Sequence, residues 1–383
     1  MRLKVLHVVP TYYPATYWGG PIHSLYGLCN TLSIAGDVEV KVLTSDSAGS
    51  NISERLNVET PCQQLPAGYE VCYCRRFLGH SISPGMLRRL PAMVRWADVV
   101  HLTGVYSFPT FPTLALCTMQ GKPVVWSPRG ALQRWEGSRK ILLKSIWDKA
   151  CNLLAKKGKI ILHATSSEEA EQSRRLITNL QTEVIPNGIE IPREIPSRTW
   201  MPDGCFRLLY IGRLNPKKGI ENLLHALKLL NGRETLSICG GGATGYVASL
   251  ERLVHDLGLD QRVSFRGHIE GAEKSEAFWN ADVCIVPSFT ENFGMVVAEA
   301  LAHAVPVVVS RGAPWRGVLE HGCGLWVDND PATLADAITA MRDRDLQAMG
   351  QSGRRWMELE FSWPSVAAAM RGLYQRLVSG KGA

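Results

Sequence analysis

The stretch from residue 281 to residue 309 constrains the fold of this chain more than any other, because its pattern changes from strand to helix and back to strand. Residues 281–286 are apolar and end at Pro287, which is typical of a buried strand. Thr290 and Asn292 can cap the helix that small and apolar residues predict over 294–303. A second apolar run predicts the next strand. Such a unit makes its two strands parallel, which is the arrangement of an α/β sheet.

Two carboxylates, Glu291 and Glu299, lie within this unit. On one helix they would be separated by roughly 12 Å along the axis and about 80° around it, whereas a glycosidase pair needs roughly 5–10 Å. We therefore expect Glu291 in the loop and Glu299 inside the helix, contacting different parts of one extended ligand. Between them, the backbone N–H groups of 292–294 would form an anion site, and Gly294 lets a ligand approach the backbone. This order suits a sugar, a diphosphate and a ribose; the alternative is two glutamates without a role.

The same residues resemble a known motif. Glu291 and Glu299, with seven residues between them in PSFTENFGMVVAEALA, resemble the E-x7-E motif of the family 4 glycosyltransferases, and the resemblance covers nearly the whole chain. These are retaining enzymes of the α/β GT-B fold, so the resemblance implies two Rossmann-like doubly wound domains facing a central cleft. It implies that Glu291 is catalytic and orients the sugar, and that Glu299 accepts ribose hydroxyls. Asn292 stands where glycine is common in the family, and the donor-binding candidates around it are Asn292, Phe293, Gly294 and Met295.

The length of the chain predicts two domains, because 383 residues exceed one ordinary hydrophobic core. We expect domains at 1–188 and 189–363, with a proline-rich linker from residue 189 to residue 204. A last helix is expected at 364–383, and the resemblance implies that it returns to the first domain. The resemblance also assigns acceptor binding to the first domain and binding of the nucleotide-sugar donor to the second.

A second motif follows the first strand expected in the second domain. Gly212, Arg213 and Lys218 belong to the string GRLNPKKG, between a strand's carboxyl end and a helix. Cationic side chains beside a helix N-terminus suit a diphosphate. The string resembles the GRLxxxKG motif of the same family, in which the arginine and the lysine contact the donor diphosphate. Arg213 and Lys218 are therefore candidate catalytic residues, and Gly212 is a donor-binding candidate.

The string GGGATG, from Gly240 to Gly245, leaves another class of enzyme open. It matches the G-x-G-x-x-G pattern of dinucleotide-binding proteins, although it lies in the second strand–helix unit of its domain instead of the first. An NAD-dependent oxidoreductase would leave the GRLNPKKG string and both glutamates unexplained. A nucleotide-sugar epimerase of the same fold and a binding subunit without activity are further alternatives. In family relatives the backbone after the next strand pairs with the nucleobase, which makes His268 and Ile269 candidates.

Four candidates lie in the first domain. Gly19 and Gly20 precede the first expected helix, either as an ordinary glycine turn or, as the resemblance implies, to approach the donor phosphates. His101 and Arg129 are expected at strand ends on the acceptor side. In many relatives a histidine stands where this chain has Arg129, so no general base is assigned there, and an arginine suits an anion better. The string SPRG around Arg129 resembles a bacterial surface-polysaccharide subgroup, which implies a role in cell-envelope polysaccharide synthesis.

Positive charge gathers in the first half of the chain. The net charge is +7; residues 1–190 carry all of it, and residues 122–159 alone carry +8. Such asymmetry suggests an anionic partner. An amphipathic helix is expected at 138–157, with basic residues opposite its apolar stripe. This helix either packs on its own sheet with a solvated basic face, or contacts anionic lipid headgroups or a lipid-diphosphate acceptor.

Other features bear on cofactors and location. We expect no signal peptide, because residues 1–4 lead into a short apolar strand, and no membrane span, because no apolar run approaches 18 residues. The ten cysteines lack zinc-site spacing, so reduced thiols in a cytoplasmic protein are expected. Asp328-Asn329-Asp330 spells the D-x-D metal motif of another glycosyltransferase fold, but we expect a helix cap. The expectation is therefore metal-independent and cofactor-free transfer from a nucleotide sugar to a saccharide or lipid-linked oligosaccharide. It would occur in the cytoplasm or at the inner face of the cytoplasmic membrane, with no nucleic-acid partner.

Overall fold

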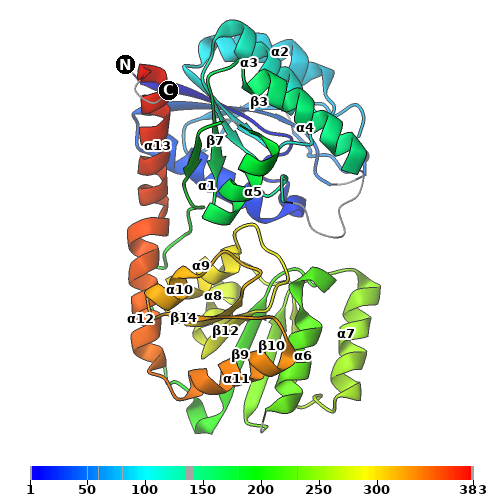
Figure 1. The fold of residues 1–383 in the computed structure, drawn as a ribbon, viewed down its shortest axis with the longest axis vertical. Helices are drawn as coiled ribbons and strands as arrows, with labels where there is room; N and C mark the ends of the chain where they lie inside the picture. The colour runs from blue at the N-terminus through cyan, green and yellow to red at the C-terminus, as the bar shows by residue number, and fades with distance from the viewer. Residues whose placement is uncertain are drawn as a thin grey trace. The chain divides into compact units, whose positions relative to one another are not determined.

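The computed structural model describes residues 2–380 except 50, 59, 80, 134–140, 179 and 231. The chain divides into two compact units, residues 1–188 with 363–383 (unit 1) and residues 189–362 (unit 2). Each unit is an α/β sandwich built on one sheet (Figure 1). Within the described residues, no helix is both long and apolar enough to cross a membrane.

Unit 1 contains an eight-stranded sheet in the order β3-β4-β2-β1-β5-β6-β7-β8, parallel except for β3. Apolar side chains on both faces make its central strands nearly continuous hydrophobic runs, as expected where helices cover both faces. The strands are β1 (Leu3–Val8), β2 (Val38–Ser45), β3 (Cys62–Gln64), β4 (Glu70–Cys74), β5 (Val99–Thr103), β6 (Val124–Ser127), β7 (Ile160–Ala164) and β8 (Thr182–Val184).

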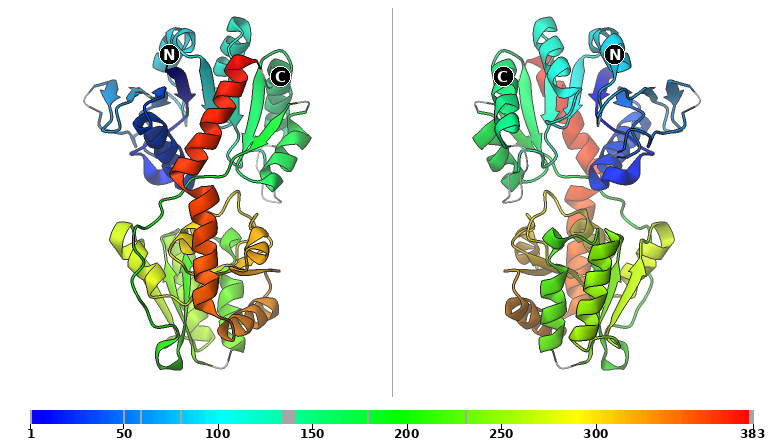
Figure 2. Two further views of the ribbon diagram at one scale, coloured as in Figure 1. Left: turned by 90° about the vertical axis from the view of Figure 1, so that its left-hand side faces the viewer. Right: turned by 90° about the vertical axis from the view of Figure 1, so that its right-hand side faces the viewer.

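Helices cover both faces of this sheet. Helices α1 and α13 share one hydrophobic cluster with β1, β2 and β5, and α13 crosses that face obliquely (Figure 2). Helices α2, α3 and α4 pack on the opposite face. The helices are α1 (Gly20–Ile34), α2 (Pro84–Trp96), α3 (Thr110–Gln120), α4 (Ile141–Ala155), α5 (Ser167–Leu176) and α13 (Trp363–Ser379), and a short 3-10 turn (Thr16–Trp18) precedes α1. The expected basic helix is thus α4, and the first residues of its expected range lie outside the described residues.

Unit 2 contains six parallel strands in the order β11-β10-β9-β12-β13-β14. This is the order 3-2-1-4-5-6 of a Rossmann fold, in which the chain starts in the middle and winds outward in both directions. The strands are β9 (Phe206–Ile211), β10 (Glu234–Cys239), β11 (Val263–Gly267), β12 (Val283–Val286), β13 (Val307–Ser310) and β14 (Gly324–Val327). The strands expected at 281–286 and 305–309 are therefore β12 and β13.

Two hydrophobic clusters fill the two sides of this sheet. One cluster joins β9 and β12 to α8, α9 and α12, and the other joins them to α6, α7 and α11. The helical segments are α6 (Ile220–Leu229), α7 (Thr244–Asp256), α8 (Gly271–Trp279), α9 (Met295–Ala302), α10 (Gly317–Glu320), α11 (Pro331–Arg342) and α12 (Leu346–Trp356), with shorter turns at Pro202–Gly204, Pro216–Lys218 and Met357–Phe361. The D-x-D string caps a helix as expected, because Asp330 accepts a hydrogen bond from the Thr333 N–H at 2.9 Å at the start of α11.

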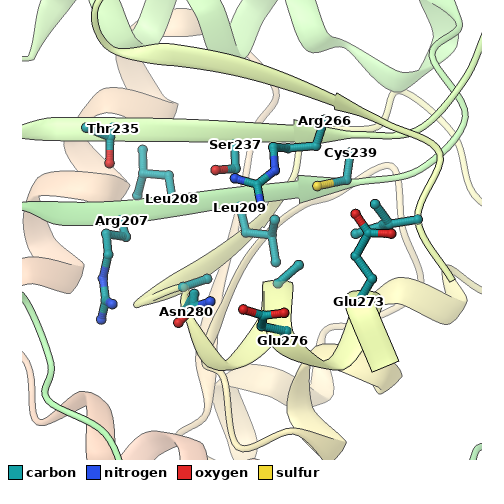
Figure 3. A pocket seen from close by; sticks show the side chains of 13 residues that line it. Arg207, Leu208, Leu209, Thr235, Ser237, Cys239, Arg266, Glu273, Glu276 and Asn280 are labelled. Carbon is teal, nitrogen blue, oxygen red and sulfur yellow. The ribbon is translucent and has the colours of Figure 1, made fainter. Parts of the chain in front are cut away.

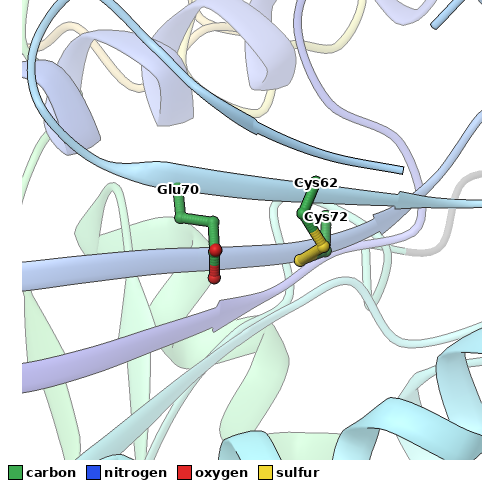
Figure 4. Close-up of side chains that lie close together, drawn as sticks. All are labelled: Cys62, Glu70 and Cys72. Carbon is green, nitrogen blue, oxygen red and sulfur yellow. A yellow bond between two sulfur atoms is a disulfide. The ribbon is translucent and has the colours of Figure 1, made fainter. Parts of the chain in front are cut away.

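The cysteine expectation is wrong for one pair. Strand β3 lies in a polar segment, and its antiparallel register with β4 places Cys62 directly opposite Cys72. Their sulfur atoms form a disulfide, and the other eight cysteines are free (Figure 4). The pairing could not be inferred from spacing, because it depends on a three-residue strand in a polar segment. Disulfides are typical of oxidising compartments.

Candidate active site

The site residues of unit 2 follow β9 and β12, which are neighbours in the sheet. The chain leaves β9 toward β10 on one side and leaves β12 toward β13 on the other. The carboxyl ends of two such strands form the crevice in which doubly wound folds bind ligands. Arg213 and Lys218 follow β9, and Glu291 follows β12. The topology therefore brings together two motifs that lie more than 70 residues apart in the chain.

Glycines set the shape of the loop after β9. Gly219 has a φ of 65° and begins α6, and a Cβ there would lie 2.1 Å from the carbonyl oxygen of Pro287. Only glycine therefore allows the two loops to come this close. The Phe289 N–H also donates to the carbonyl of Lys217 at 2.9 Å, which fixes the loop after β12 against the loop after β9.

Lys218 and Glu291 form an ion pair at this junction. The ammonium group of Lys218 contacts Oε1 of Glu291, and the Ser288 hydroxyl donates to the same oxygen at 2.8 Å. Their side chains are 21% and 13% exposed, so both remain accessible from solvent. Arg213 lies in the same loop after β9 and is exposed, and the Tyr210 hydroxyl donates to its carbonyl oxygen at 3.1 Å. Two of the three candidate catalytic side chains are thus in direct contact.

The start of α9 completes this part of the site. Gly294 is the residue before the helix, with a φ of 79°, and Phe293 is buried against Trp315. The Glu291 N–H donates to the Gly312 carbonyl at 2.8 Å, which holds the loop in place. The first backbone N–H groups of α9, from Met295 onward, form the positive end of a helix of eight residues.

Glu299 lies inside α9 as expected, and its partner is a residue that the sequence analysis missed. It is the only ionisable residue of that helix, whose other side chains are apolar. The Lys274 ammonium, from α8, donates to Oε1 of Glu299 at 2.7 Å, with both side chains between a quarter and a third exposed. A lone lysine between two strands is too common in sequences to single out.

The remaining donor-side candidates lie around the ends of β10 and β11. His268 is exposed and pairs with Glu270 at 2.8 Å, whereas Ile269 is buried in the core. The glycine-rich turn has a packing explanation. A Cβ on Gly240 would lie 1.8 Å from the Gly212 carbonyl oxygen, and one on Gly242 would lie 2.3 Å from that of Leu214. These glycines let the turn pack against the GRLNPKKG loop, so the G-x-G spacing needs no dinucleotide.

An open pocket of about 220 Å³ lies elsewhere in unit 2. Figure 3 shows it between strands that carry Thr235, Ser237 and Arg266 and a helix that carries Glu273 and Glu276. It shares only Ile269 with the candidate residues. The charged candidate residues of this unit therefore do not line this pocket.

In unit 1, His101 is fully buried in a chain of hydrogen bonds whose directions can be assigned. His163 Nε2 donates to the Ile185 carbonyl at 2.9 Å, so its Nδ1 accepts from the Ser127 hydroxyl at 2.6 Å. The Ser127 oxygen then accepts from His101 Nε2 at 2.6 Å, and His101 Nδ1 accepts from Tyr374 at 2.5 Å. Both histidines are neutral, and burial lowers the pKa of each. Both ring nitrogens of His101 are therefore occupied within unit 1.

The other first-domain candidates have unusual backbone conformations. Gly19 has a φ of 71° and precedes α1, which starts at Gly20. Arg129 follows β6 with a φ of 54°, a conformation that non-glycine residues rarely adopt. Its guanidinium donates to the Asn187 side-chain oxygen. The positive charge of Arg129 contributes to the lowered pKa of His101.

Only one group of three potential metal ligands occurs among the described residues. Cys62, Glu70 and Cys72 have ligand atoms within 4.8 Å of one another, on the β3–β4 edge of unit 1 (Figure 4). The disulfide uses both sulfur atoms, and Lys41 pairs with Glu70 at 3.2 Å. This group is remote in the sequence from every candidate site residue.

Comparison with known proteins agrees with the fold and with the family that the motifs indicate. Residues 205–343 match the family glycosyl transferases group 1, which confirms the predicted resemblance for most of unit 2. A D-inositol 3-phosphate glycosyltransferase from Xylanimonas cellulosilytica is 33% identical over 233 residues, covering 56% of each chain. The chain spans about half the length of the curated relatives it matches.

Solved structures resemble the chain over nearly its whole length. Sucrose-phosphate synthase from Thermosynechococcus elongatus has a TM-score of 0.76 at 20% identity, covering 99% of this chain and 100% of that one. Anabaena Alr3699/HepE in complex with UDP has a TM-score of 0.73 at 18% identity, covering 98% and 100%. The chain therefore has the GT-B fold that its sequence predicts.

Proposed function

We propose that this chain, whose residues 205–343 match glycosyl transferases group 1, is a retaining glycosyltransferase. It would move a sugar from a nucleoside-diphosphate sugar to a saccharide or lipid-linked acceptor in cell-envelope polysaccharide synthesis. One observation carries the proposal. Lys218 contacts Glu291 where β9 and β12 end, and Glu291 and Glu299 stand on either side of the start of α9, within the segment that matches the family.

The roles of the residues follow from the charges that develop when the donor sugar leaves its diphosphate. Arg213, Lys218 and the first N–H groups of α9 would stabilise the departing diphosphate. Preorganised donors of this kind contribute about 3 kcal/mol each. Glu291 would accept hydrogen bonds from the sugar hydroxyls, and its contact with Lys218 keeps both side chains in place before the donor binds. Glu299, held by Lys274, would accept the ribose hydroxyls.

Retention requires attack on the face from which the diphosphate departs. The acceptor hydroxyl oxygen would form a bond to the anomeric carbon as the bond from that carbon to the phosphate oxygen breaks. The hydroxyl proton would pass to the departing phosphate oxygen, so the protein need not supply a base. This step also takes no electrons from a cofactor, and Arg213 and Lys218 would supply positive charge without a metal.

On the acceptor side, helix α4 carries exposed apolar and basic side chains. Ile146 and Leu153 of α4 are 66% and 60% exposed, and Lys149, Lys156 and Lys157 beside them are exposed as well. Exposed apolar and basic side chains on one helix suit the surface of an anionic membrane. We therefore include peripheral contact with the inner face of the cytoplasmic membrane in the proposal. Disulfides are rare in the cytoplasm, so the Cys62–Cys72 disulfide bears on this location. Measuring whether the two cysteines are oxidised in the purified protein checks it.

The first experiment measures thermal stabilisation by UDP, GDP, ADP and NAD without added metal. A ligand at 100 times its dissociation constant stabilises the folded state by about 2.7 kcal/mol. Stabilisation by one nucleoside diphosphate, lost in an Arg213→Gln variant, would support the proposal and name the base. Stabilisation by NAD alone would refute it. Because an epimerase of this fold would also bind the nucleotide, transfer to an acceptor with release of nucleoside diphosphate must then be detected.

A further inference from the structure

Polar side chains gather at the place in unit 1 that corresponds to the crevice of unit 2. Strands β1 and β5 are neighbours in its sheet, and the chain leaves them in opposite directions. The register places His7 beside His101, and Thr103 lies two residues further along the same face of β5. Their carboxyl ends form the point where an open parallel sheet binds ligands.

Several buried polar atoms here have no partner among the described residues. They are both ring nitrogens of His7, the hydroxyls of Thr11 and Thr103, and Nε of Arg129. His7 is fully buried, with its ring 4.7 Å from that of His101, and it is neutral because burial lowers its pKa to about 3. One nitrogen of a neutral ring carries a hydrogen, so His7 offers an unused donor. A buried donor left unsatisfied destabilises the folded state, because it has lost its hydrogen bond to water.

Among the described residues, no carboxylate forms an ion pair with Arg129. Its guanidinium donates to the amide oxygen of Asn187, which is uncharged. Glu169 is the acidic side chain that acts on Arg129 electrostatically, but its oxygens accept from the Gly130 N–H and from both Thr165 donors. The positive charge of Arg129 lowers the pKa of His7, so the two side chains share one region.

We propose that the carboxyl ends of β1, β5 and β6 form an anion site in which Arg129, His7 and Thr103 bind a phosphoryl or carboxylate group. Each of the three can donate a hydrogen bond, and only an anion satisfies the donors and the charge together. Water would satisfy the donors alone. The strained backbone of Arg129 fits this role, because such strain is retained where the position of a side chain matters. That the anion is part of the acceptor rests on the proposed function; the site itself does not.

The test measures binding of inorganic phosphate in chloride buffer by calorimetry. The Arg129→Gln variant is compared with wild type and with Arg75→Gln, which removes the same charge from an exposed position. Hydrogen bonds to charged groups contribute about 1.5–3 kcal/mol, so Arg129→Gln should weaken phosphate binding about tenfold or more, and Arg75→Gln hardly at all. No binding to wild type, or equal binding to Arg129→Gln, would overturn the anion site.

Two further arms identify the source of the anion. Phosphate binding that is lost only in Arg213→Gln would place the phosphate at the donor diphosphate site and overturn the inference. If Arg129→Gln weakens the binding of a nucleoside diphosphate as much as the binding of phosphate, the bound phosphoryl group belongs to the donor, and the assignment to the acceptor is wrong. If wild type binds phosphate but no nucleoside diphosphate, the proposed function fails while the anion site stands.

A second variant covers the case in which Arg129→Gln does not fold, as circular dichroism would show. Thr103→Val keeps the shape of the side chain and removes one donor, so phosphate affinity should fall about fivefold. Unchanged affinity in a folded Thr103→Val protein would then overturn the inference.

Discussion

The ion pair between Lys274 and Glu299 allows the ribose role of Glu299 to be tested quantitatively. A hydrogen bond to a charged group contributes about 1.5–3 kcal/mol. Glu299→Gln should therefore weaken nucleoside-diphosphate binding about tenfold to a hundredfold. The Lys274 and Glu299 side chains are 29% and 28% exposed, so their pair is screened by solvent. Such pairs contribute about 0.2–1 kcal/mol, and Lys274→Met should weaken binding only about twofold to fivefold.

The assay is calorimetric titration of the four proteins of a double-mutant cycle with the nucleoside diphosphate that binds. If Lys274 acts by positioning Glu299, Lys274→Met has no further effect in the Glu299→Gln background. A matched titration with the 2′,3′-dideoxy nucleotide isolates the ribose hydroxyls, and both variants should bind it as wild type does. Equal losses for the two nucleotides would refute the ribose role of Glu299. If Lys274→Met weakens binding in the Glu299→Gln background as much as in wild type, the positioning role of Lys274 is refuted.

Four other outcomes are expected. Glu291→Ala should lower the rate of transfer strongly while nucleoside-diphosphate affinity stays within about twofold, because Glu291 is assigned to the sugar; a large loss of nucleotide affinity would contradict that assignment. Gly219→Ala should lower stability in urea by at least about 1–2 kcal/mol, because the residue has a positive φ and no room for a Cβ; an unchanged unfolding midpoint would show that the loop adapts. The folded-state pKa of His163 is lowered to about 3, below its unfolded value of 6.5, so the unfolded chain takes up the proton first. Between pH 7 and pH 5, His163 should therefore lower the free energy of unfolding by about 2 kcal/mol, and His163→Asn should reduce this pH dependence. An equal fall in wild type and variant would contradict the lowered pKa of His163. Replacing both Lys149 and Lys156 by glutamate should reduce sedimentation with anionic vesicles but leave neutral vesicles unaffected, and equal sedimentation would remove α4 from the membrane proposal.

Local sequence patterns were enough to predict several strands and helices of the fold. The apolar runs before Pro287 and before Gly212 form strands β12 and β9, as their pattern indicates. The small and apolar residues that follow Asn292 form helix α9. The candidate residues on these strand ends could be named for the same reason, since a parallel sheet places function at its carboxyl edge. The disulfide and the strand β3 escaped prediction, because a three-residue strand has too little pattern to recognise.

The hydrogen-bond and ion-pair partners of side chains were harder to predict than their positions on strands and helices. Lys274 could not be paired with Glu299 from the sequence, because 25 residues and a strand separate them and only the packing of α8 beside α9 joins them. His101 was a strand-end candidate, yet its ring is saturated by Ser127 and Tyr374. The unpaired ring of His7, which the sequence analysis passed over, is the histidine available to a ligand in that region.

The sequence by itself determined the fold class, the two-domain organisation and the motifs that suit a diphosphate and a ribose, because these depend on residue type and short spacing. The tertiary structure decided which charges are compensated. Lys218 pairs with Glu291, whereas Arg129 contacts the uncharged Asn187 and pairs with no carboxylate of the part of the chain that the structure describes. That difference depends on distances between segments far apart in the chain, which strand order and register set and composition does not.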